Sequence, residues 1–162
     1  MPDQTEICSM IIDTLKSLFR RDLNKLRQEL ELYRHEENIW KKDKQIANAA
    51  GNLCLHLVGN LNTYIGKEIG ATDYIRNRDL EFSQKMIPRE DLLRMIDDTI
   101  HVVDVSLEKL YGTDLERDYP IVVFDRITSM HYMLVHLATH LAYHLGQVNY
   151  HRRLLDETQD PG

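Results

Sequence analysis

The sequence predicts an all-α protein, a four-helix bundle whose helices are joined by long crossover connections. Four stretches carry apolar residues at steps of three and four, as one face of a helix does, and almost nothing alternates like a strand. The polar segments between them, residues 34–46, 66–87 and 113–127, are longer than the turns of a simple up-and-down bundle. No repeat or domain boundary interrupts the pattern, so we expect residues 1–162 to form a single domain.

The first predicted helix runs from about Glu6 to Tyr33, and the second from about Ala47 to Ile65. Each has an apolar face that a bundle would bury. The residues of these faces are Met10, Ile11, Leu15, Leu18, Leu23, Leu26 and Leu30 in the first helix, and Leu53, Leu57, Leu61 and Tyr64 in the second.

The third predicted helix opens at Pro88, a favourable residue for a first turn, and stops near Gly112. Two acidic residues follow soon after the proline, where the helix dipole favours negative charge. The fourth helix begins around Thr128 or Ser129, either of which can cap it, and continues to about Leu155.

The composition is that of a globular protein and excludes several functions. The formal net charge is -6, from 20 Lys and Arg against 26 Asp and Glu, and an acidic chain is repelled by phosphate backbones. No apolar run approaches the roughly 20 residues that cross a bilayer, and the acidic N-terminus is unlike a secretory signal peptide. We therefore expect a cytoplasmic protein that binds neither nucleic acid nor membrane, with Cys8 and Cys54 reduced and buried.

A stripe of polar residues follows the last predicted helix. His136, His140, His144 and Gln147 share one face, and His151 falls on it too. The adjoining face is apolar and must point into the core, so the stripe lies at the edge of the buried surface. Buried imidazoles need a hydrogen bond or a metal ion, because their desolvation is otherwise costly.

The histidines predict a site for one divalent transition metal. His140 and His144, four positions apart, form the chelate that a single helix can offer, and His56 in the apolar second helix is the candidate third ligand. Alone, each of these histidines is more simply read as a satisfied core residue. Imidazole suits Zn, Ni, Fe and Cu alike, so the ligands do not select the metal. The remaining histidines, His35, His101 and His131, are expected to be solvated or structural.

Three further residues are candidates for supporting this site. Gln147 can hydrogen-bond a ligand histidine or merely satisfy its amide at the edge of the core. His136 can support a ligand or line a pocket. Asn60, one turn from His56, can orient that imidazole or face another helix.

Residues 136–147, with the pattern His-x-x-x-His-x-x-Tyr-His-x-Gly-Gln, resemble the last-helix signature of the DinB-like metalloprotein superfamily. That superfamily includes bacillithiol S-transferases and mycothiol-dependent maleylpyruvate isomerases. Residues 51–60 are similar to its second-helix segment, residues 38–40 to the aromatic stretch before that helix, and residues 76–82 to an uncharacterised branch.

The resemblance covers nearly the whole chain and implies His56, His140 and His144 as metal ligands. It also implies a DinB-like bundle with crossover connections and a homodimer. One departure is Leu145, where many members carry a basic residue, so a substrate contact at that position is not carried over.

Three imidazoles leave coordination positions open, as in catalytic zinc sites. A metal-dependent hydrolase would also need a proton-handling carboxylate, and the stripe has none, although Glu36, Glu37 or Glu81 could reach in from the connections. A thiol S-transferase needs no such base, because the metal itself stabilises the thiolate. We therefore favour metal-dependent transfer of a low-molecular-weight thiol to a small-molecule substrate.

Other functions stay open or are excluded. A non-catalytic dimeric metal-binding or sensing protein remains an alternative, as does a haem-binding bundle. A ferritin-like di-iron protein is excluded, because no predicted helix carries Glu-x-x-His.

Overall fold

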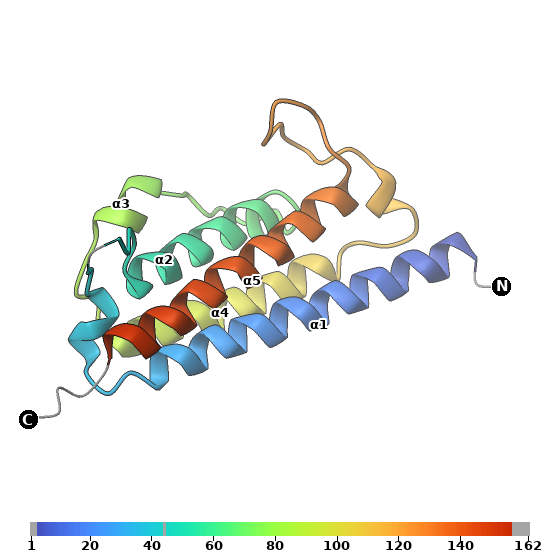
Figure 1. Ribbon diagram of the computed structural model, residues 1–162. Coiled ribbons are helices and arrows are strands. Elements are labelled where there is room, and N and C mark those ends of the chain that lie inside the picture. Colours follow the sequence, from blue (N-terminus) through green and yellow to red (C-terminus); the bar gives the residue numbers. More distant parts are fainter. Residues whose placement is uncertain (1–2, 44, 157–162) are drawn as a thin grey trace, which may run out of the picture.

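The computed structural model describes residues 3–43 and 45–156. Within these ranges the chain is all-α, as predicted, with helices and no β-strand beyond one isolated bridge between Asp118 and Ser129. The ends of the predicted single domain, residues 1–2 and 157–162, lie outside the described residues. The α-helices of the described chain are α1 (Gln4–Glu31), α2 (Ala50–Leu61), α3 (Arg78–Ser83), α4 (Arg89–Leu107) and α5 (Met130–Leu155) (Figure 1).

The first two predicted helices are present with shifted ends. α1 begins earlier than predicted because Asp3 accepts a hydrogen bond from the backbone N–H of Glu6, whose side chain accepts in return from the N–H of Asp3. α2 is shorter than predicted and continues into the π-helical segment η2 (Asn62–Lys67).

The starts of the last two long helices agree with the sequence signals. Pro88 is the N-cap of α4, which ends at Leu107, before the Gly112 predicted as its end. Gly112 itself lies in a turn with a φ of 57°. Ser129 caps α5 by accepting a hydrogen bond from the N–H of Tyr132.

The short helix α3 lies in a segment that was expected to be a polar connection. The side chain of Asn77 caps it, accepting a hydrogen bond from the N–H of Leu80. A helix of six residues is too short to show a repeating apolar face, so periodicity does not detect it. Glu81 is its buried residue.

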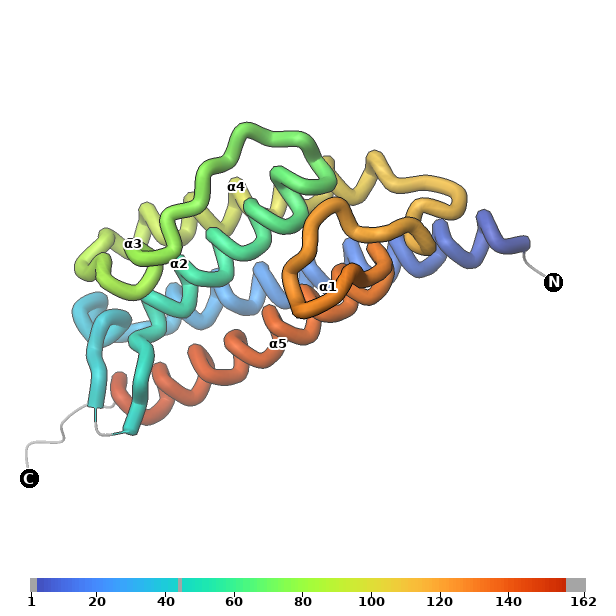
Figure 2. Tube along the Cα trace, turned by 90° about the horizontal axis from the view of Figure 1, so that it is seen from above, coloured from blue at the N-terminus to red at the C-terminus, as the bar shows by residue number. Residues whose placement is uncertain are grey.

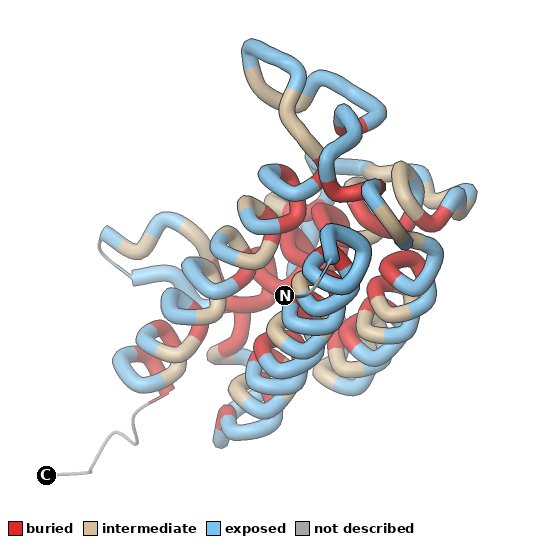
Figure 3. The backbone as a smooth tube through the Cα atoms, turned by 90° about the vertical axis from the view of Figure 1, so that its right-hand side faces the viewer, coloured by how far each residue is buried: buried red, intermediate tan, exposed pale blue. Residues whose placement is uncertain are grey.

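The four long helices lie side by side (Figures 1 and 2). α1 contacts α4 and α5, α2 contacts the same two helices, and α3 packs against α2. Buried positions face inward between the helices, whereas exposed positions cover their outer faces (Figure 3). Cys8 and Cys54 are both buried and form no disulfide, as predicted.

Every residue of α2 is buried, including three polar ones. Asn52, His56 and Asn60 recur at four-residue steps and so share one face of the helix. A polar face inside a protein needs hydrogen-bond partners, and α3 covers part of this one.

Among the described residues, no helix is both long and apolar enough to cross a membrane.

Candidate metal centre

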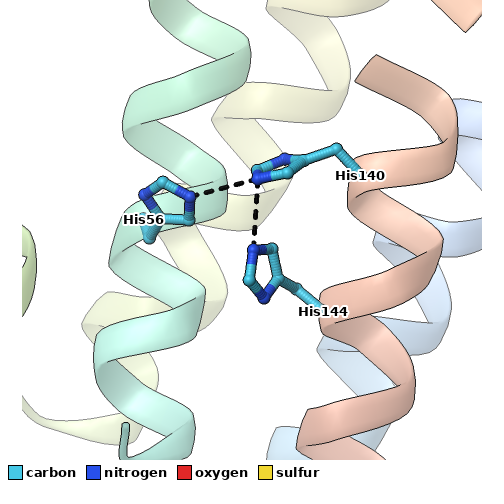
Figure 4. A group of neighbouring side chains, drawn as sticks. All are labelled: His56, His140 and His144. Atoms are coloured by element: carbon cyan, nitrogen blue, oxygen red, sulfur yellow. Dashed lines mark hydrogen bonds between the residues drawn. The ribbon is translucent and has the colours of Figure 1, made fainter. Parts of the chain in front are cut away.

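The three histidines predicted as ligands converge between α2 and α5 (Figure 4). The Nε2 atom of His140 lies 3.3 Å from Nε2 of His56 and 3.1 Å from Nε2 of His144. One ring nitrogen from each residue can be chosen so that all lie within 4.8 Å of one another. The group can therefore hold a metal ion, with two ligands from one turn of α5 and one from the facing helix.

The hydrogen-bond partners of two of these rings support this interpretation. Nδ1 of His56 faces a carboxylate oxygen of Glu81 at 3.0 Å, and Nδ1 of His144 faces the amide oxygen of Gln147 at 2.6 Å. Each of these oxygens accepts, so both Nδ1 atoms carry the proton and both Nε2 atoms present a lone pair toward His140. A cation satisfies converging lone pairs that neutral imidazoles cannot all satisfy among themselves, so the donor set fits a metal ion.

Burial keeps two of the rings neutral. It lowers the pKa of His140 to about 4, helped by the neighbouring histidines and Arg76. Burial likewise lowers the pKa of His56, although the hydrogen bond and charge of Glu81 act in the opposite direction. Near neutral pH, both imidazoles are therefore in the free-base form that binds metals.

The three candidate supporting residues, Gln147, His136 and Asn60, make different contacts. Gln147 accepts the hydrogen bond from His144 Nδ1 described above. The ring of His136 stacks on that of His140 with centroids 6.0 Å apart, and its other neighbour is Phe124 at 4.9 Å. Asn60 is buried, and its side-chain oxygen has no hydrogen-bond partner among the described residues. Glu81, rather than Asn60, contacts the Nδ1 atom of His56.

The other histidines do not join the cluster. His151 is buried on the far end of α5, where its ring nitrogens bond the hydroxyl of Tyr33 at 2.7 Å and the carbonyl of Lys41 at 2.8 Å. The remaining ones, His35, His101 and His131, are exposed.

Only one of the carboxylates named from the sequence approaches the site. Glu36 accepts a hydrogen bond from the N–H of Arg89, and Glu37 lies beside His35. Glu81 does reach the centre, but on the Nδ1 side of His56, away from the converging nitrogens.

Sequence reasoning missed how Glu81 and Arg76 are paired. The guanidinium of Arg76 donates to both carboxylate oxygens of Glu81, over 2.6 and 2.9 Å. The signal that could have found this pair is the buried polar face of α2, which requires partners from another segment.

A protein-family model described as "Protein of unknown function (DUF1572)" matches residues 6–160 of the chain. Comparisons with curated proteins and with solved structures give no match.

Proposed function

The chain belongs to the DUF1572 family, and we propose that it is a metal-dependent thiol S-transferase whose divalent metal activates a low-molecular-weight thiol. The observation that carries this proposal is the convergence of three imidazole nitrogens between α2 and α5. His56, His140 and His144 would hold the metal. A divalent ion on three neutral imidazoles keeps open coordination positions and strongly lowers the pKa of a thiol bound there.

The chain's own residues orient the site. Glu81 and Gln147 accept the Nδ1 protons of His56 and His144, which leaves the opposite nitrogens free as donors to a metal. The placement of two ligands on α5 and one on α2 keeps the donor atoms together only while these helices are packed.

The placement of carboxylates favours thiol transfer over hydrolysis. A metal-dependent hydrolase ordinarily uses a carboxylate near its water to move protons. Within the described chain, the converging group consists of imidazoles alone. The carboxylate of Glu81 is bonded to Arg76 and His56 and is therefore not available as a base.

Metal analysis tests the binding step. We expect the purified protein to retain about one divalent ion per chain, and His140→Ala to lose it. His131→Ala is the matched control, because His131 is an exposed histidine of the same helix. Equal metal content in the wild type and His140→Ala would overturn the proposed site.

Thiol conjugation tests the reaction. Bacillithiol, mycothiol, glutathione and coenzyme A are each assayed with an electrophile, before and after chelation of the metal. The proposal expects one thiol to be consumed in a chelator-sensitive reaction. Esterase activity that is lost on chelation, without consumption of any thiol, would favour the hydrolase instead.

We also propose that the long helices form a DinB-like four-helix bundle with crossover connections. The contacts of α1 and of α2 with both α4 and α5 support this arrangement. The long segments that join the helices are consistent with it. An experimental structure in which α1 failed to contact both α4 and α5 would contradict it.

A further inference from the structure

Glu81 is a buried carboxylate whose two oxygens are both occupied. Its side chain is about as buried as the core residues around it, with 7% exposed. One oxygen accepts from Nε of Arg76, and the other accepts from Nη2 of Arg76 and from Nδ1 of His56. A buried ion pair is a poor source of stability, because desolvation offsets most of its attraction. The contact of Glu81 with His56, a candidate metal ligand, indicates a role other than stabilisation.

The surface of α2 is shaped to admit this carboxylate. A Cβ atom at Gly59 would collide with Oε1 of Glu81, so the absence of a side chain there makes room for it. The amide of Asn52 donates to the backbone carbonyls of Glu81 at 2.9 Å and Gln84 at 2.8 Å. Asn52, His56 and Gly59 lie on one side of α2, and together they seat the end of α3 on that helix.

The contact selects one tautomer of His56. The carboxylate of Glu81, which only accepts hydrogen bonds, lies 3.0 Å from Nδ1, closer than the Nη2 donor of Arg76 at 3.4 Å. The imidazole therefore donates from Nδ1 to Glu81 and keeps a lone pair on Nε2. The ring of Phe82, the next residue of α3, packs against the same imidazole with centroids 5.2 Å apart. Orientation and tautomer are thus both set by two adjacent residues of one short helix.

We propose that Glu81, held in place by Arg76, is the positioning residue of the metal centre: it aims Nε2 of His56 at His140 and His144 as a lone-pair donor. This inference rests on the proposed function, because it assumes that these nitrogens bind a metal. Glu81 touches no reacting atom and acts through His56.

The three candidate ligands are unequally supported. The Nδ1 atom of His144 is bonded to the neutral amide of Gln147, and Nδ1 of His140 is buried without a partner among the described residues. Of these three candidate ligands, only His56 is bonded to a charged acceptor within the described chain. Loss of such a partner lowers metal affinity by about 10–100-fold in other proteins, so we expect an effect of that size for Glu81.

The test compares metal affinity across variants of the full chain. Dissociation constants for Zn²⁺ and Co²⁺ are measured by competition with a chelator for the wild type, Glu81→Gln and Asp79→Asn. Asp79 is an exposed acid of the same helix, so its variant removes one negative charge without touching His56. We expect Glu81→Gln to bind about 10–100-fold more weakly and to change the Co²⁺ absorption spectrum, and Asp79→Asn to do neither.

A second measurement does not depend on metal or on the variant's folding. The ¹⁵N shifts of the His56 ring in the metal-free wild type should identify a neutral imidazole protonated on Nδ1. Protonation on Nε2 would overturn the inference. So would a Glu81→Gln protein that bound Co²⁺ as tightly as wild type with an unchanged spectrum. A wild type that bound no metal would instead refute the proposed function and leave the tautomer to decide the positioning role.

Discussion

Gly59 and Gly146 show how differently a single methyl group acts at two helical positions. Both lie in helices, yet a Cβ at Gly59 meets the carboxylate of Glu81, whereas one at Gly146 meets nothing within 4 Å. Glycine in a helix interior costs conformational entropy relative to alanine. At Gly59 the glycine is needed, because a side chain would occupy the space that the carboxylate of Glu81 fills. At Gly146 no packing contact requires a glycine.

We therefore expect opposite outcomes from the same substitution. Gly59→Ala should lower the free energy of unfolding by about 1–3 kcal/mol, because the carboxylate must shift, and should also weaken metal binding. Gly146→Ala, its matched control, should raise stability by about 0.5–1 kcal/mol and leave metal affinity unchanged. Urea unfolding and metal competition measure both quantities. An unaltered metal affinity in Gly59→Ala would speak against the role assigned to Glu81.

At the scale of elements, the long helices were predictable and the short one was not. The apolar periodicity of α1, α2, α4 and α5 follows from the faces that they bury, and Pro88 and Ser129 mark two of their starts. α3 is too short for periodicity, and its buried residue is the charged Glu81, whose carboxylate contacts His56 on α2. A hydrogen bond between segments that are distant in sequence produces no repeating pattern of residue types in that sequence.

The candidate site likewise has a part that could be predicted from the sequence and a part that could not. His140 and His144 could be paired from helical spacing, and His56 from its apolar context. The environment of each Nδ1 atom depends on tertiary packing, so the polar face of α2 indicates that partners are needed but does not identify Glu81 and Arg76 as those partners. Gln147 is the exception, because it lies one turn from His144 on the same helix.

The cap of α5 gives a prediction at this scale. Ser129→Ala removes the acceptor for the N–H of Tyr132 and should cost about 1 kcal/mol of unfolding free energy. Fraying is confined to the first turn, so metal affinity, which depends on residues further along α5, should not change. Ser17→Ala in the exposed middle of α1 is the control and should be neutral or slightly stabilising. A large loss of metal from Ser129→Ala would mean that the start of α5 is coupled to its centre.

For the whole molecule, the buried His151 links stability to pH. It ties α5 to the hydroxyl of Tyr33 and the carbonyl of Lys41, and its burial lowers its pKa below the ordinary 6.5. The hydrogen bond to Lys41 raises the pKa but does not cancel the effect of burial. As the pH falls below 6.5, the unfolded chain takes up the proton first, so folding is progressively disfavoured until the folded-state pKa is reached.

In the metal-free protein, His151 should accordingly contribute a loss of stability between pH 6.5 and its own lower folded-state pKa, in addition to the losses from His56 and His140, whose pKa values are also lowered. Urea unfolding of the metal-free chain at several pH values between 7.5 and 5 measures the slope. His151→Gln should be less stable at pH 7.5, because it loses buried hydrogen bonds, and should show a shallower slope. His101→Gln, a change at an exposed histidine, should keep the wild-type slope. A His151→Gln slope equal to that of the wild type would assign the acid sensitivity to other groups.

The residues of the metal centre are separated by very different distances along the sequence. His56 and Glu81 are 25 positions apart, whereas His56 and His140 are 84 positions apart. Closing the longer loop costs more chain entropy, and contacts between distant positions slow folding. The half of the centre on α2 and α3 can therefore assemble before α5 docks, whereas the complete set of nitrogens exists only after docking. An ion held by all of them would act as a reversible cross-link between the two halves of the chain. It would bind the folded chain and not the folding intermediates in which α5 has not yet docked.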